Sequence, residues 1–232
     1  MRSVAGLLRV LLMGSAVVLT ACASFPQHMV PTVTAMPDMG PPAQRPVAHM
    51  DVSFFAGEPG NNPTPLNEGQ PGIKELQLLV HKTVNESGLF QQVLYDGATA
   101  QPATDPNGLH VSLRVFDHCS ATGAMIASLV TGFTLGLVPG GTTDNFTLQL
   151  EVTNSRGQTL ARVSNDDATR TWVGLAFLPV SGHELRQSTH AMLANQIRAA
   201  LKQAYDAGKL VAVNAPPATD GSSVMPAVAG VK

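Results

Sequence analysis

The sequence predicts an α+β fold, a two-layer sandwich in which two helices cover one face of a mostly antiparallel sheet of about 4–5 strands. Apolar and polar residues alternate in several short segments, which is typical of half-buried strands. In two longer segments the apolar residues recur every three or four positions, which is typical of amphipathic helices. These segments follow one another in the order β-α-β-β-insert-β-β-α.

The first half of this order contains a strand, a helix and two further strands. Alternating apolar residues predict a strand at 50–54, and a loop rich in Gly, Pro and Asn follows at 57–72. The next apolar positions have helical spacing and stop before Gly88, a residue type that often ends helices: Ile73, Leu76, Leu79, Val80 and Val84. Residues 92–95 predict a short strand and residues 109–115 a longer one.

The second half contains a hairpin and the last helix. Residues 146–152 alternate as a strand, and a turn signal separates them from a hairpin partner at 159–165. Residues 169–173 either extend that partner or form another strand. A capping box, Ser181-x-x-Glu184, predicts the start of a helix. The apolar positions of this helix recur up to Gly208: Leu185, Met192, Leu193, Ile197, Leu201, Ala204 and Tyr205.

Residues 1–21 have the features of a secretory signal peptide. Two arginines and no acidic residue occur in the segment, an apolar run occupies 10–19, and small residues precede Cys22. A transmembrane anchor is the alternative, but the run is shorter than the roughly 20 apolar residues that span a bilayer well. Signal peptides are removed from mature proteins, so residues 1–21 are left out of the predicted fold.

The end of this segment, Leu19-Thr20-Ala21-Cys22, resembles the lipobox of bacterial lipoproteins. The resemblance implies cleavage before Cys22, a diacylglyceryl group on its thiol and an acyl chain on its new amino group. The lipid bilayer would then be a partner of the protein. Ala23 follows the cysteine where Gram-negative lipoproteins that stay in the inner membrane carry Asp. The resemblance therefore implies an outer-membrane anchor with a domain that faces the periplasm.

Composition divides the rest of the chain into three parts. Residues 22–46 contain six prolines and little charge, and they predict a tether without a packed core. Residues 47–211 contain all the predicted strands and helices and form the domain. Residues 212–232 predict a disordered tail, because they too lack periodic apolar positions.

The order of elements in the domain resembles that of small envelope lipoproteins. A helix leads into Gly88-Leu89-Phe90 and a short strand, as in curli-secretion and lipopolysaccharide-assembly lipoproteins and the amino-terminal domain of the Tol-Pal translocation protein. This resemblance is one of pattern and carries no motif. It implies the fold and not a particular activity.

An uncharged insert occupies residues 120–141, within a stretch that has no Asp, Glu, Lys or Arg from 118 to 143. Small residues recur there every fourth position, which on a helix would form one flat face that another backbone can approach: Ala124, Ser128, Gly132, Gly136 and Gly140. Three interpretations remain open: a segment buried under the sheet, a surface segment that contacts the bilayer or a partner, and a transmembrane span. For the second, the candidate contact residues are Gly132, Leu135, Gly136, Leu137 and Gly140.

No motif for catalysis, a cofactor or a metal is recognised. Asp117-His118-Cys119 contains the residue types of a nucleophilic site. Neighbouring side chains of a strand point to opposite faces, however, so these three cannot all meet at one site. His183-Glu184-x-x-Gln187 lacks the second histidine of a zinc-protease motif. Asp166-Asp167 follows a polar turn and is expected to be solvated. We therefore expect no catalytic residues, no metal site and no cofactor.

The function that these observations predict is a lipid-anchored, non-enzymatic binding or scaffolding domain of the cell envelope. The alternative is an accessory subunit of an envelope secretion or lipid-transport complex, in which the Gly132, Gly136 and Gly140 face packs against an envelope protein or a second copy. Nucleic acid is excluded as a partner, because 14 basic residues against 16 acidic ones give a net charge of −2.

Overall fold

The computed structural model describes residues 22–67, 69–70, 72–95, 108–119, 121–134, 136–180 and 185–210. The predicted signal peptide, the capping box at 181–184, the tail at 212–232 and Leu135 lie outside these residues.

Among the described residues, seven strands form one mixed sheet in the order β1-β7-β6-β5-β2-β3, and β4 also pairs with β2. Their bounds are β1 (Cys22–Pro26), β2 (Val47–Ala56), β3 (Thr64–Leu66), β4 (Gln92–Tyr95), β5 (Leu109–Cys119), β6 (Gly140–Asn154) and β7 (Thr159–Val173). The predicted α+β class is confirmed, but the predicted number of strands is wrong. The missed strands β1 and β3 are too short to show a regular alternation of apolar residues. Both lie at the edges of the sheet.

β2 makes the sheet mixed. It is parallel to β5 along one side, and on its other side it pairs with β4 in its first half and with β3 in its second half. Helix α2 (Ile73–Glu86) connects β2 to the parallel strand β4, as a crossover between parallel strands requires. The pairs β5–β6, β6–β7 and β1–β7 are antiparallel, so most of the sheet agrees with the prediction.

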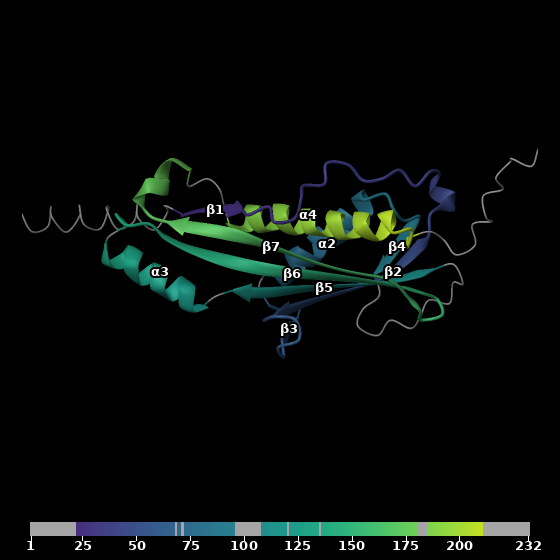
Figure 1. Cartoon of the computed structure of the whole chain (residues 1–232), viewed down its shortest axis with the longest axis horizontal. Coiled ribbons are helices and arrows are strands. Elements are labelled where there is room, and N and C mark those ends of the chain that lie inside the picture. The colour runs from purple at the N-terminus through teal and green to yellow at the C-terminus, as the bar shows by residue number, and fades with distance from the viewer. Residues whose placement is uncertain are drawn as a thin grey trace, which may run out of the picture.

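The core lies between the sheet and two helices, α2 and α4 (Leu185–Asp206), which Figure 1 shows together on one side of the strands. Alternate side chains of β5 and β6 are buried beneath these helices, including Leu113, Leu148 and Leu150. Leu193, Ile197 and Leu201 of α4 complete this cluster. Each such side chain contributes about 1.5–3 kcal/mol of stabilisation when it leaves water. The alternation at 109–115 and 146–152 and the spacing of the last helix therefore predicted the core correctly.

Residues 22–33, the first half of the predicted tether, differ from that prediction, because their backbone is bound to the domain. β1 pairs with β7 from Cys22↔Val173 to Pro26↔Thr169. Beyond β1, the Asn195 side chain of α4 accepts a hydrogen bond from the Val33 N–H at 2.8 Å and donates to the Val30 carbonyl at 3.2 Å. The backbone groups of Val30 and Val33 in this proline-rich segment belong to no helix or strand, and a polar side chain of the domain forms hydrogen bonds with them instead.

Asp167 of β7 contributes to the same attachment. Its Oδ1 accepts the Met29 N–H at 3.1 Å, and the residue is only 2% exposed. The expectation that Asp166 and Asp167 are solvated is therefore wrong for Asp167. The turn signal before the strand suggested an exposed pair, but alternate residues of β7 face the layer that holds α4 and the amino-terminal segment.

Helix α3 (Ala121–Phe133) forms from the insert and packs against the start of β6. Gly140 is the close contact, because a Cβ there would overlap Thr131 Oγ1 and the Ala127 carbonyl oxygen. Gly132 lies on α3 itself, and a Cβ at that position would meet no atom within 4 Å. Two glycines of the same insert therefore have opposite surroundings.

Replacement of Asn195 by Ala is expected to lower the free energy of unfolding by about 1–3 kcal/mol, because it leaves the buried Val30 carbonyl and the partly buried backbone groups of Pro31 and Val33 without this partner. Urea denaturation measures the change. Lys202→Ala on the same helix is the control, since it removes only an exposed ion pair with Asp206 that is worth roughly 0.5 kcal/mol or less. Equal effects of the two substitutions would contradict the attachment described above.

The surroundings of Gly140 and Gly132 predict that alanine substitutions at the two positions change stability in opposite directions. Gly140→Ala is expected to destabilise the protein by about 1–3 kcal/mol, because the new methyl group overlaps α3. Gly132→Ala is expected to stabilise it by roughly 0.5–1 kcal/mol, because Ala restricts the unfolded chain and favours the helix. Urea midpoints of both variants test this, and a neutral Gly140→Ala would show that α3 does not pack on β6 in this way.

Candidate functional site

Helix α3 lies at the end of the sheet where β1 begins, and Figure 1 shows α3, the start of β1 and the 3₁₀ helix η2 (Leu175–Val180) at this same end. The strand register places Cys22 opposite Val173 of β7, and Val173 opposite Gly140 of β6. These three residues form one row across three strands. Because Gly140 contacts α3, the row joins Cys22 to the helix.

The apolar side chains of α3 are exposed. Seven of the ten large hydrophobic residues found exposed among the described ones belong to α3 or the turn after it. We call these seven the apolar surface: Met125, Ile126, Leu129, Val130, Phe133, Leu137 and Val138. Phe133 is 94% exposed and Leu137 is 76% exposed. Such a concentration at one place on a folded protein marks an interaction surface.

The exposure of these side chains and the length of α3 bear on the three interpretations of the insert. A segment buried under the sheet is wrong, because the side chains of the apolar surface face outward. Within the described residues, no helix combines the length and the apolar character needed to cross a membrane. The 13 residues of α3 span about 20 Å, whereas the hydrocarbon core of a bilayer is about 30 Å thick. A surface segment is the interpretation that agrees with the structure.

The predicted face of small residues does not form. Gly132 is on α3, but Gly136 follows the helix with a φ of 80°, and Gly140 is in β6. The helix gives way to a turn in which Gly136 has left-handed φ, and the Gly136 N–H donates to the Thr131 carbonyl at 2.7 Å. The spacing of four thus crosses a helix end that the sequence pattern did not predict.

The candidate contact residues are consequently separated. Gly136 and Gly140 are buried, whereas Gly132 and Leu137 are exposed. Leu135 lies outside the described residues. The predicted contact residues did not include the large apolar side chains of α3, although their spacing on a helix could have indicated them: Met125, Ile126, Leu129 and Phe133. The prediction followed the small residues of the insert instead of the large ones.

An aromatic cluster lies at the same end of the sheet. Trp172 of β7 pairs with Ala23 and with Gly141, and its ring stacks on Phe177 of η2 at a centroid distance of 5.6 Å. The Arg170 guanidinium lies 4.4 Å from the centroid of the Trp172 ring. A Cβ on Gly141 would come within 2.9 Å of this ring, so glycine allows the close approach. The indole has an apolar body and a polar N–H, a combination suited to a boundary between water and an apolar phase.

Asp117-His118-Cys119 lies at the end of β5 and is not arranged as a nucleophilic site. The His118 Nε2 is 2.9 Å from Thr147 Oγ1, and Thr147 donates to Asp166 Oδ1 at 2.5 Å. His118 thus points toward Thr147 and away from the thiol. A hydrogen bond to Asp144, followed by burial, raises the pKa of the Cys119 thiol to about 11. At neutral pH the thiol therefore stays protonated and is a poor nucleophile.

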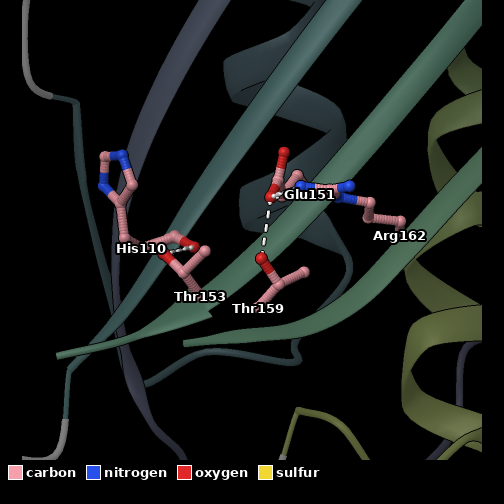
Figure 2. Close-up of polar contacts among 5 residues, drawn as sticks. All are labelled: His110, Glu151, Thr153, Thr159 and Arg162. Carbon is pink, nitrogen blue, oxygen red and sulfur yellow. Dashed lines mark hydrogen bonds and ion pairs between the residues drawn. The ribbon is translucent and has the colours of Figure 1, made fainter. Parts of the chain in front are cut away.

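A polar region lies elsewhere on the sheet. Figure 2 shows Glu151 as its centre: the carboxylate accepts hydrogen bonds from the Thr159 hydroxyl at 2.9 Å and from the Arg162 Nη2 at 2.9 Å. The bond from Arg162 is the main cause that holds the pKa of Glu151 below its ordinary value. Arg114, also nearby, lines the same pocket as Glu151 and Arg162. The charged groups on this part of the sheet contrast with the apolar end near Cys22.

Comparisons with known proteins give distant structural likenesses. No protein-family model matches the chain, and no curated protein sequence matches it. A minor lipoprotein from Acinetobacter baumannii is 9% identical over 72% of this chain and 96% of its own, with a TM-score of 0.35. The PelC dodecamer from Paraburkholderia phytofirmans is 10% identical over 74% of this chain and 96% of its own, with a TM-score of 0.24. Likenesses this distant do not assign the chain to a family.

Proposed function

We propose that the protein is a lipoprotein of the bacterial envelope, held at the outer membrane by acyl chains on Cys22, with a binding or scaffolding domain in the periplasm. The observation that carries this proposal is the position of Cys22. It ends the pattern Leu19-Thr20-Ala21-Cys22, and it is also the exposed first residue of β1.

The place of Cys22 in the sheet supports a close attachment to the bilayer. Acyl chains contribute about 0.8 kcal/mol per buried CH₂ group, so two or three of them anchor a protein stably. Because residues 22–26 are paired with β7, no spacer separates the acylated residue from the domain. The end of the sheet that carries Cys22 would therefore lie at the bilayer surface.

The chemistry of the strand ends supports binding over catalysis. The thiol of Cys119 has a raised pKa, and His118 is engaged by Thr147. Glu151 is neutralised by Arg162 in an exposed ion pair, which is an ordinary arrangement for a protein surface. These groups are held by structural hydrogen bonds and do not converge on a common point.

Ala23 supports the outer-membrane assignment through the lipobox resemblance, but it also has a structural role. Its side chain is fully buried in β1, opposite Trp172. An Ala23→Asp substitution would bury a carboxylate, so it would confuse a change in sorting with a loss of folding. A test of the anchor is cleaner at Cys22, which is exposed.

The anchor is tested by labelling cells with a radioactive fatty acid and separating membrane from soluble fractions. The wild-type protein is expected to carry the label and to need detergent for extraction, because its acyl chains lie in the bilayer. Cys22→Ala is expected to carry no label. Cys119→Ala is the matched control and is expected to behave as wild type, since Cys119 is the second cysteine of the chain.

An unlabelled wild-type protein would overturn the proposal, as would label on Cys22→Ala. The proposal also fails if wild type and Cys22→Ala both fractionate as soluble proteins.

A further inference from the structure

We propose that the apolar surface of α3 is a second membrane contact, which inserts into the bilayer leaflet that holds the acyl chains of Cys22. This inference rests on the proposed function for the source of the bilayer. The contact itself is a property of the folded domain and can be measured without acylation.

The side chains of α3 divide into two faces. Met125, Ile126, Leu129, Val130 and Phe133 are exposed, and helical geometry places them within an arc of about 140°. Ala127 and Thr131 lie outside this arc and contact Gly140 of β6. The helix therefore uses its small residues to pack on the sheet and presents its large apolar residues outward.

The charge pattern suits insertion into lipid. Residues 118–143 contain no Asp, Glu, Lys or Arg, so α3 and the turn after it can enter the apolar phase without burying such a charge. Leu137 and Val138 extend the apolar surface beyond the end of the helix. A helix that lies in a membrane interface in this way buries its apolar face about 5–10 Å deep.

The short distance between Cys22 and α3 favours the bilayer as the partner that covers the apolar surface. Cys22 and Gly140 are two strand spacings apart in the row through Val173, which is roughly 10 Å. Acyl chains on Cys22 would therefore hold α3 beside the leaflet.

The aromatic cluster adds a second, independent feature at this end. Gly141 and Gly140 are adjacent in β6 and face opposite sides of the sheet, so Trp172 and α3 flank the end of the sheet on its two faces. Trp172 and Arg170 have the chemistry of residues found at the level of lipid headgroups. Both faces of this end thus carry groups suited to a membrane surface.

The test uses residues 22–232 with Cys22→Ala, which retain every described strand and helix and have no acylation site. Vesicles of phosphatidylethanolamine and phosphatidylglycerol are mixed with this protein and floated on a density gradient. The protein is expected to float with the vesicles. A Phe133→Asp, Leu137→Asp double variant is expected to bind at least about tenfold more weakly, because it places two carboxylates in the apolar surface.

Leu78→Asp is the matched control. Leu78 is 59% exposed on α2, outside the apolar surface, so its replacement is expected to leave vesicle binding unchanged. Urea midpoints of the variants show whether each remains folded. A second variant, Phe133→Trp with Trp172→Phe, keeps the surface apolar, and brominated lipids are expected to quench its single tryptophan.

Failure of the unacylated protein to float, or equal floating by the double variant and the control, would overturn the second contact. Absence of quenching at position 133 would do the same. If the protein without lipid is an oligomer that the double variant converts to a monomer in sedimentation equilibrium, a second copy covers the surface and the proposal fails. If the wild-type protein carries no acyl label in cells but the Cys22→Ala protein still binds vesicles, the lipid anchor is refuted and the second membrane contact remains supported.

Discussion

The pairing of β6 with β7 is the interaction on which both ends of the molecule depend. Each strand has 15 residues, and their ladder continues from the hairpin turn to Gly140↔Val173. Near the turn, Leu150 and Val152 of β6 contribute to the core. At the other end the same ladder receives β1 and α3. The core therefore fixes the position of the apolar end through two continuous strands.

The elements of the core could be predicted because each has a clear period. Leu109, Val111 and Leu113 alternate without interruption, and the last helix repeats its apolar positions over several turns. These periods arise because each strand or helix buries only one face, so apolar residues recur wherever the chain returns to that face. The class of fold and the positions of β2, α2, β5 and the β6–β7 hairpin follow from them.

The parts that could not be predicted depend on partners distant in the sequence. Residues 27–33 have no period of their own, and Asn195 and Asp167 hold them in place. The short strands β1 and β3 need only a free edge to pair with. The small-residue spacing of the insert failed for a local reason, since the chain leaves the helix before Gly136, which has left-handed φ. The sequence indicated Cys22 and Leu137 as candidate membrane-contact residues, but it did not predict that both lie at the same end of the sheet.

The pairing of β1 also determines how the protein would respond to mechanical force. An acyl chain on Cys22 would pull on the first residue of a strand whose five residues all pair with β7. A pull along the axis of β1 loads those backbone hydrogen bonds together in shear, whereas a pull across the strand would break them one after another. If the bilayer lies beyond the end of the sheet, as proposed, tension on the anchor would run along the strand. The paired residues of β1 would then bear this force, whereas a loose tether would transmit it to the domain at Val47.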